Sequence, residues 1–391
     1  MPPQSRRKAC CLRSDEMVQP AGDVALAPLT TLGVGGAARW FASARNARDV
    51  LDVSRWVGDR GCELFVLGGG SNLVVADRGF DGLVLRIDAL GCELRIRDGE
   101  LLVDAAAGES WDAVVARTVD AGFSGLECLS GIPGRVGGTP IQNVGAYGQE
   151  VAQSIAGVTA LDCTTGRVVR LTAQECEFSY RQSRFKSRDR GRFIVTSVAF
   201  RLGDTPPVLT YPDVIAHAKR QGVREPSVAD VRQWILDIRR RKGMVLDAAD
   251  AVLDPDTRSV GSFFMNPTVT EATHAGMARI AARNSPRVPS GSGAGPPGFP
   301  TAQGGVKVPA AWLIERSGFS RGHVAGRTGL SSKHPLAIVN RGGATAREII
   351  EFAALVKRRV AETFGVWLQP EPVFVGFTDD ETVSFLQKAN G

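Results

Sequence analysis

The sequence has few of the residues that build a metal site or a disulfide framework. Its 391 residues include four histidines and seven cysteines, an odd number with no Cys-x-x-Cys pair. Zinc sites and small disulfide-rich domains need clustered imidazoles and thiols. The sequence therefore predicts no metal, and it favours a protein that resides in the cytoplasm.

Long apolar runs are also missing. No segment approaches the roughly 18 apolar residues of a membrane-spanning helix. The N-terminus carries a basic cluster, Arg6-Arg7-Lys8, but no apolar segment follows it, so it does not have the pattern of a secretory signal. We expect no membrane partner, and we interpret residues 1–22 as a disordered basic tail.

A strong excess of charge of either sign is missing as well. The net charge of +6 arises from 47 basic and 41 acidic side chains. This mild excess suits small anionic molecules and is too diffuse to indicate nucleic acid. The length predicts two or three domains, and the 43% hydrophobic and 23% charged shares are those of an ordinary soluble protein.

Glycine is abundant and concentrated in two places. Residues 123–151 contain six glycines between 131 and 148, interleaved with apolar residues. Such backbone admits close approach of a ligand, and its free N–H groups can hold an anion such as a diphosphate. A surface loop is the alternative, but the apolar residues indicate that this segment is buried. The second cluster, Gly68 to Asn72, lies between expected strands at 63–67 and 73–75, and Ser71 and Asn72 can bond phosphate.

A third glycine pattern, Gly33 to Ala38, matches the GxGxxA of dinucleotide-binding folds. Its context does not: Leu29 to Leu32 form a poor buried strand, and residues 39–41 do not begin an amphipathic helix. We therefore reject a Rossmann fold.

Elsewhere, periodicity and capping residues predict regular elements. The expected helices begin near Asn46 and end at Gly61, begin at Ser110 and end at Gly122, span 227–242, run from Pro309 to Gly318, and follow a capping box at Thr345 and Glu348. Further strands are expected at 83–87, 155–161, 168–171 and 193–200. Residues 284–305, rich in Pro, Gly and Ser, are interpreted as a flexible insertion.

Seven motifs occur in one order: LGGGSN, SGIPGRVGGTPIQNVGAYG, FSYRQSRFK, SVGSFFMNP, KVPAAWLIE, KHPLAIVN and WLQPEP. This series closely resembles the UDP-N-acetylenolpyruvoylglucosamine reductases, from about Leu29 to Val375. The Leu209-Thr-Tyr-Pro segment resembles the loop of one subclass of this family, in which a tyrosine lies over the substrate. The resemblance implies an α+β protein with a PCMH-type FAD-binding fold. It predicts FAD-binding subdomains at 23–88 and 89–205, a substrate-binding domain at 206–364, and residues 365–391 packing back on the first subdomain.

The implied reaction uses NADPH and a non-covalent FAD to reduce an enolpyruvyl ether to a lactyl ether in peptidoglycan precursor synthesis. The resemblance implies that Arg181 binds the substrate carboxylate and that Ser262 protonates C2. It also implies that a protonated Glu371 hydrogen-bonds to the developing enolate. Tyr211, Lys242 and Asn266 match residues that contact the UDP-sugar. The FAD-contacting positions implied are Gly68, Gly69, Gly70, Ser71, Asn72, Gly131, Ile132, Pro133, Gly134, Gly137, Gly138, Thr139, Asn143, Gly145, Ala146 and Tyr147.

Two features depart from the family pattern: Met265 stands where many relatives have Lys or Arg, and Gln369 replaces a glutamate. Two other functions fit the sequence less well. An alcohol or hydroxy-acid oxidase of the same fold gives no role to Arg181, Ser262 and Glu371 together. A nucleotide- or nucleic-acid-binding module without catalysis is supported only by the basic pI and by Arg239 to Lys242. We expect a monomer.

Overall fold

The computed structural model describes residues 18–246, 254–284, 296–301 and 304–389. The predicted tail up to residue 17 and residues 285–295 and 302–303 of the predicted insertion lie outside these ranges. The insertion contains β14 (Phe299–Pro300), which pairs with β15 (Val306–Lys307) directly after the insertion. Among the described residues, no helix has the length and apolarity to span a membrane, and no three His, Cys, Asp or Glu side chains are grouped to hold a metal.

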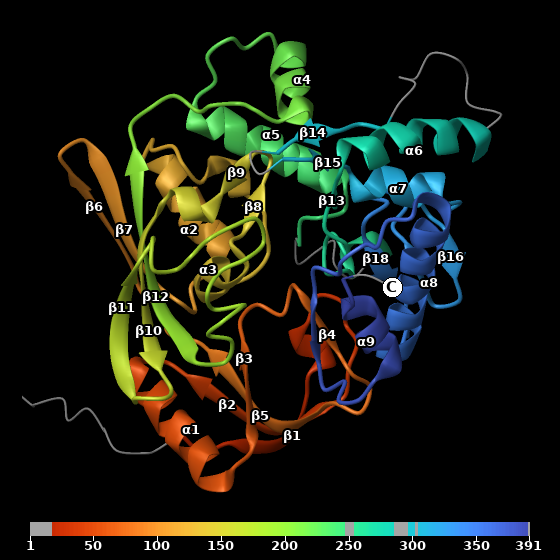
Figure 1. Ribbon diagram of the computed structural model, residues 1–391. Helices are drawn as coiled ribbons and strands as arrows, with labels where there is room; N and C mark the ends of the chain where they lie inside the picture. The colour runs from red at the N-terminus through yellow and green to blue at the C-terminus, as the bar shows by residue number, and fades with distance from the viewer. Residues whose placement is uncertain (1–17, 247–253, 285–295, 302–303, 390–391) are drawn as a thin grey trace, which may run out of the picture.

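The first sheet has the strand order β1-β2-β5-β3 (Figure 1). It comprises β1 (Ala21–Ala25), β2 (Ala37–Ala44), β5 (Phe80–Ile87) and β3 (Glu63–Leu67). Helix α1 (Ala47–Arg60) joins β2 to β3; the Asn46 side chain caps its start, and Gly61 ends it at φ 60°. The predicted helix is thereby confirmed. The GxGxxA segment leads into a strand, in agreement with the rejection of a Rossmann fold. Residues 21 and 22, assigned to the tail, are part of β1.

The second sheet is antiparallel, in the order β11-β10-β12-β7-β6. Its strands are β6 (Cys92–Arg97), β7 (Glu100–Ala106), β10 (Ile155–Asp162), β11 (Arg167–Thr172) and β12 (Phe193–Gly203). Helix α2 (Trp111–Asp120) covers it, and the buried Trp111 ring lies 5.8 Å from Phe200. Leu85 of the first sheet shares this core. The two sheets are thus fixed to each other by one apolar cluster.

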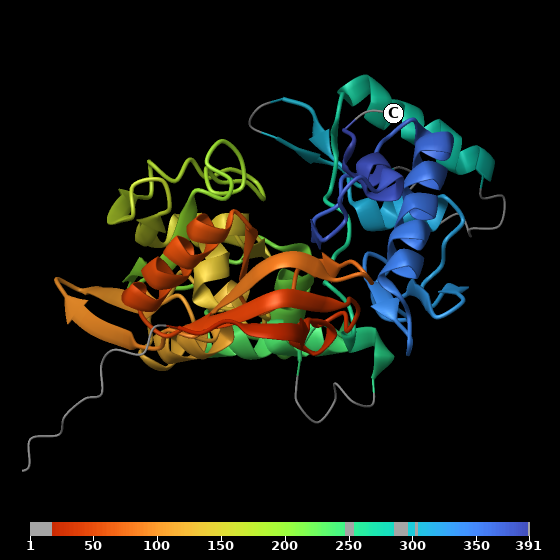
Figure 2. The ribbon, with the colours of Figure 1, turned by 90° about the horizontal axis from the view of Figure 1, so that it is seen from below.

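A helical part, teal and blue in Figure 2, lies beside the two sheets. It contains α6 (Glu271–Asn284), α7 (Ala310–Arg316), α8 (Ala346–Phe364) and α9 (Glu381–Gln387), with short strands β13 (Thr268–Val269), β16 (Val324–Ala325), β17 (Thr328–Leu330) and β18 (Ile338–Asn340). The predicted capping box of α8 is present, because Thr345 and Glu348 bond each other's backbone N–H groups. Ile349, Phe352 and Val356 then point into the core.

Helices α4 (Pro212–Gln221) and α5 (Val228–Arg241) pack on the glycine-rich segment. Val214, Trp234 and Ile235 form one buried cluster with Cys128, whose short helical turn, η2 (Glu127–Leu129), precedes Gly131. The predicted boundary at residue 206 assigns these helices to the substrate-binding domain. The division into domains stays a prediction.

The end of the chain returns to its beginning. Strand β19 (Val373–Val375) pairs in parallel with β4 (Leu73–Val75), which directly follows the Gly68–Asn72 turn. The glycine-rich segment also supplies η3 (Val136–Gly138), α3 (Thr139–Gln142), β8 (Gly145–Ala146) and β9 (Gln149–Glu150). Residues more than 290 positions apart are therefore neighbours at this turn.

A buried lysine joins α8 to the C-terminal helix. Lys357 is fully buried, and its Nζ donates to the backbone carbonyls of Phe385, Leu386 and Lys388 at 2.7–3.1 Å. Replacing it by methionine keeps the apolar length but leaves three carbonyls without this donor. We expect Lys357→Met to lower the free energy of unfolding by about 1–3 kcal/mol, measured by chemical denaturation. Arg359→Met, exposed on the same helix, is the control; equal stability of the two variants would contradict this role.

Candidate active site

The two predicted cofactor segments touch through their backbones. The Ser71 hydroxyl donates to the Pro133 carbonyl at 2.9 Å. A Cβ on Gly69 would lie 2.6 Å from the Gly134 Cα, and one on Gly70, at φ +66°, would lie 1.9 Å from the Leu29 carbonyl oxygen. Only glycine fits at these positions. Among the described residues, the N–H groups of Gly69 and Gly70 have no backbone acceptor. The turn therefore offers free donors to an anion.

A buried positive charge lies on helix α5, beside Gly131 of the glycine-rich segment. Gly131, at φ +69°, donates its N–H to Asp112 at 2.6 Å, and Asp112 in turn pairs with both Nη atoms of Arg232. Two turns further along α5, Arg239 is 4% exposed, and its Nη2 donates to the Met244 carbonyl. Its Nε has no partner in the described part of the chain. A buried guanidinium N–H without a partner beside a glycine turn suits an anionic ligand. The residues present therefore fit the diphosphate of a dinucleotide.

Arg181 and Glu371, 190 residues apart, form an ion pair. The Arg181 Nε lies 2.8 Å from Glu371 Oε1, and Nη2 donates to the Gly145 carbonyl at 2.6 Å. Gln142 donates to the same Glu371 oxygen at 3.2 Å. Both charged side chains are largely buried. Arg181 has a positive φ of 56°, so an uncommon backbone conformation directs this side chain. Within the described residues, its Nη1 donates no hydrogen bond to a side chain or carbonyl.

Ser262 lies next to this pair through backbone contacts. The Glu371 N–H donates to the Phe263 carbonyl at 2.9 Å, and Phe264 forms a bridge with Pro370. The Ser262 hydroxyl is 3.4 Å from Nε2 of His334. Burial, reinforced by Lys242 and Arg239, lowers the pKa of His334 to about 3, so this imidazole is neutral. The three predicted catalytic residues are thus brought to one region.

Tyr211 and Lys242 gather around the glycine-rich segment. The Tyr211 and Tyr147 rings meet edge to face at 5.3 Å, and Lys242 Nζ lies 5.6 Å from the Tyr147 ring centre. Lys242 also pairs with Asp213 at 3.0 Å. One cation and two aromatic rings therefore lie together at this end of the glycine-rich segment, and the contact of Tyr211 and Lys242 with a UDP-sugar stays a prediction.

Other predicted site residues have structural partners. The Asn143 amide is 1% exposed and bonds Glu150 and the Ser179 carbonyl, while Thr139 donates to Val136. Asn266 accepts the N–H of Ala310 at the start of α7. Side-chain contacts of these three residues with a ligand stay predictions. The structure also adds two residues that the sequence analysis did not select: His334, inside the KHPLAIVN motif, and Gln142.

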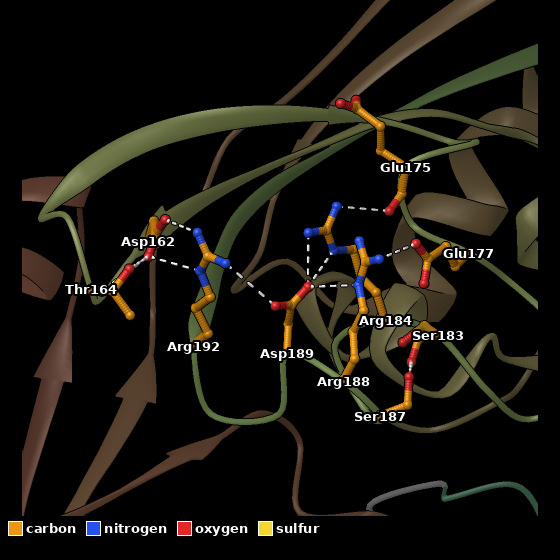
Figure 3. A network of polar contacts seen from close by, with 10 residues as sticks. All are labelled: Asp162, Thr164, Glu175, Glu177, Ser183, Arg184, Ser187, Arg188, Asp189 and Arg192. Atoms are coloured by element: carbon orange, nitrogen blue, oxygen red, sulfur yellow. Dashed lines mark hydrogen bonds and ion pairs between the residues drawn. The ribbon is translucent and has the colours of Figure 1, made fainter.

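The segment carrying Arg181 is held by a network of ion pairs (Figure 3). Asp189 contacts the guanidinium groups of Arg184, Arg188 and Arg192 at 2.7–3.4 Å. Arg192 also pairs with Asp162 of β10 at 2.7 Å and lowers the pKa of that carboxyl group. The network therefore ties residues 184–192 to the second sheet, and Arg181 is presented from an anchored loop.

Comparisons with known proteins identify the family. A family model described as UDP-N-acetylenolpyruvoylglucosamine reductase, C-terminal domain, matches residues 254–375, and one described as FAD binding domain matches residues 38–172. A UDP-N-acetylenolpyruvoylglucosamine reductase from Thermobifida fusca is 47% identical over 365 residues, covering 92% of this chain and 98% of that protein. The chain belongs to the UDP-N-acetylenolpyruvoylglucosamine reductase family.

Further comparisons agree with this assignment. The reductase from Streptomyces coelicolor is 45% identical over 369 residues, covering 93% of this chain and 92% of that protein. The crystal structure of the reductase from Thermus caldophilus covers 92% of this chain and 100% of its own, with a TM-score of 0.60 and 24% identity, and supports the fold. The predicted family, the FAD cofactor and the α+β, PCMH-type fold are confirmed.

Asp189 of this reductase provides a test of the anchored loop. Asp189→Asn removes the one charged acceptor of Arg184 among the described residues and one of the two of Arg188 and Arg192, which keep Glu177 and Asp162. Loss of a charge-assisted hydrogen bond costs about 1.5–3 kcal/mol, so we expect roughly tenfold to 100-fold faster amide exchange in residues 176–192. Hydrogen-exchange mass spectrometry measures this, with the exposed Asp81→Asn as control. Unchanged exchange would show that other contacts hold the loop.

Proposed function

We propose that this reductase converts UDP-N-acetylglucosamine enolpyruvate to UDP-N-acetylmuramate with NADPH. The observation that carries the proposal is the Arg181–Glu371 pair beside Ser262, in a chain that joins an FAD-binding domain to the reductase C-terminal domain. Hydride adds to C3 of the enolpyruvyl group and a proton to C2, so the double bond becomes single while NADPH is oxidised to NADP⁺.

Bound FAD supplies the hydride carrier between NADPH and the substrate. Gly68 to Asn72 and Gly131 to Gly134 would hold its diphosphate, since both segments present backbone to one place. Attachment is non-covalent in this proposal, because no His or Cys occurs in either segment.

Arg181 is proposed to bind the substrate carboxylate. Its Nε and Nη2 are occupied by Glu371 and Gly145, which fixes the plane of the guanidinium. Nη1 then remains to approach a carboxylate oxygen from the side. A positioned positive charge stabilises the negative charge that develops at C2 and spreads into the carboxylate.

Ser262 is proposed to deliver the proton to C2. A hydroxyl is a weak acid, so its conjugate base needs stabilisation by neighbouring groups. Beside it, His334 is neutral and carries one N–H and one bare nitrogen, which suits hydrogen bonding to either form of the serine. Lys242 and Tyr211 are proposed to contact the UDP part, and their position beside Tyr147 of the glycine-rich segment supports this.

We also propose a monomer in the cytoplasm. All of the residues assigned above come from one chain, and the partners are small molecules: a UDP-sugar and NADPH. The five cysteines in the described residues are all unpaired, as is usual in a reducing compartment.

The Ser262→Ala variant should affect only one of the two half-reactions, which are flavin reduction by NADPH and flavin reoxidation by the substrate. Because Ser262 acts only when C2 takes its proton, flavin reduction by NADPH should be unchanged, and flavin reoxidation by the enolpyruvyl substrate should slow by about 10²–10⁴-fold. Arg181→Lys should also slow reoxidation, since an ammonium cannot reproduce the planar guanidinium. Anaerobic stopped-flow absorbance follows both steps.

The exposed Ser320→Ala serves as the matched control for the serine variant. If Ser262→Ala slows the NADPH step and leaves reoxidation unchanged, the proton-donor role is wrong. If neither flavin nor enolpyruvyl substrate binds to the unaltered protein, the proposed activity fails as a whole.

A further inference from the structure

A lysine with no role in the function proposed above contacts both members of the Arg181–Glu371 pair, one directly and the other through a glutamine. Lys186 is the last residue of the FSYRQSRFK motif and lies five residues after Arg181. Its Nζ donates to Gln142 Oε1 at 2.9 Å and to the Arg181 backbone carbonyl at 3.1 Å. One ammonium group is therefore bonded to both sides of the candidate active site.

The positive charge of Lys186 is unfavourable where it lies. Burial lowers the pKa of its ammonium group; Glu371 raises this pKa, and the charges of Arg181 and Arg190 lower it again. The two acceptors of the ammonium group are an amide oxygen and a carbonyl oxygen, so neither carries a charge that balances it. Ionisable side chains whose charged form is disfavoured in this way cluster at functional sites. The contacts of Lys186 therefore indicate a function.

The ammonium group determines which way the Gln142 amide faces. An ammonium has three N–H donors and no acceptor, so it binds only the oxygen end of an amide. With Oε1 held by Lys186, Nε2 of Gln142, the last residue of α3, donates to Glu371 Oε1 at 3.2 Å. The reversed amide would place its oxygen against the carboxylate, and the two acceptors would repel each other. Lys186 therefore selects the orientation in which Gln142 is a donor to Glu371.

Both donors to the Glu371 side chain reach the same oxygen. Arg181 Nε lies 2.8 Å from Oε1, and Gln142 Nε2 lies 3.2 Å from it. Within the described residues, Oε2 accepts no hydrogen bond. A carboxylate has acceptor sites on each oxygen, so two fixed donors on Oε1 orient the group and leave Oε2 to a ligand.

The second contact of Lys186 supports the uncommon backbone conformation of Arg181. This residue has a φ of 56° and lies between Ser179 and Gln182, whose N–H groups donate to each other's carbonyls at 3.0–3.1 Å. A residue other than glycine keeps such a conformation only where its surroundings maintain it. The Arg181 carbonyl accepts from Lys186 Nζ, so the ammonium group bonds this turn at the residue with positive φ.

We propose that Lys186 is a positioning residue of this reductase, which orients Gln142 toward Glu371 and holds the turn that presents Arg181. It acts on the reaction through Gln142 and the Arg181 backbone, not through a contact with the substrate. The inference rests on the proposed function, because that function assigns Arg181 and Glu371 to the enolpyruvyl half of the reaction. A displacement of about 1 Å in groups of this kind can slow a reaction about 100-fold.

Anaerobic stopped-flow absorbance of the FAD-loaded, full-length protein tests the proposal. Lys186→Met keeps the apolar length without the donor. It should slow flavin reoxidation by UDP-N-acetylglucosamine enolpyruvate by about tenfold to 100-fold and leave flavin reduction by NADPH unchanged. Lys186→Arg keeps a cation that only donates, and it should recover part of the lost rate. Lys219→Met, exposed on α4, is the control and should change neither step.

A double variant tests whether Lys186 acts through Gln142. Gln142→Met should slow the same reoxidation step. In that background Lys186→Met should slow it by a smaller factor than in the unaltered protein, because the two residues share one contact. Effects that multiply in full would show that the two residues act independently.

Hydrogen exchange gives a further measurement that needs no turnover. Lys186→Met should speed exchange of the Ser179 and Gln182 amides by about tenfold or more, whereas Gln142→Met leaves the Arg181 carbonyl bonded and should not. If substrate does not reoxidise the flavin of the unaltered protein, the proposed function fails, and the exchange still tests the contacts of Lys186. The positioning role is overturned by unchanged reoxidation in Lys186→Met, by equal rates in the arginine and methionine variants, by independent effects in the double variant, or by unchanged exchange.

Discussion

The backbone of residues 370–375 is the contact on which the assembled site depends. Glu371 donates its N–H to Phe263, Val373 donates to Asn72, and the Asn72 side chain returns a bond to the Glu371 carbonyl at 3.3 Å. The parallel pairing of β19 with β4 continues this contact. One short segment thereby joins the Gly68–Asn72 turn, the Ser262 loop and, through the Glu371 side chain, Arg181. Without this segment, Arg181, Ser262 and Glu371 would not be held close together in space.

Glycine also allows the two proposed cofactor segments, Gly68 to Asn72 and Gly131 to Gly134, to touch through their backbones. Where Gly69 approaches Gly134, two backbones meet at a distance that no side chain allows. Backbone polar groups at such a junction are shielded from water and need hydrogen-bond partners. The Ser71 hydroxyl satisfies one of them by donating to the Pro133 carbonyl across the junction. The turn can therefore present N–H groups inward and still be anchored on both sides.

Local sequence patterns predicted the elements well, because caps and periodicity act over a few residues. Asn46, Thr345 and Glu348 cap the helices that they were expected to cap. The glycine turns could also be predicted, since so dense a run of glycines destabilises a helix or a strand. The Arg181–Glu371 pair could not be derived from periodicity, because nothing local specifies a contact across 190 residues; only the family resemblance placed both in one site. His334 was missed because its environment, and not its neighbours in sequence, makes it unusual.

The ion pair also gives Glu371 an electrostatic role in the assembled site. Its carboxylate balances the largely buried charge of Arg181, and an isolated charge there would be costly. Glu371 accepts from Nε and the Gly145 carbonyl accepts from Nη2, so two contacts fix the plane of the guanidinium. A guanidinium held in this way can receive a second carboxylate at Nη1 without first having to be oriented, and positioning of this kind lowers the cost of binding. The segment that joins the site therefore also orients its main positive charge.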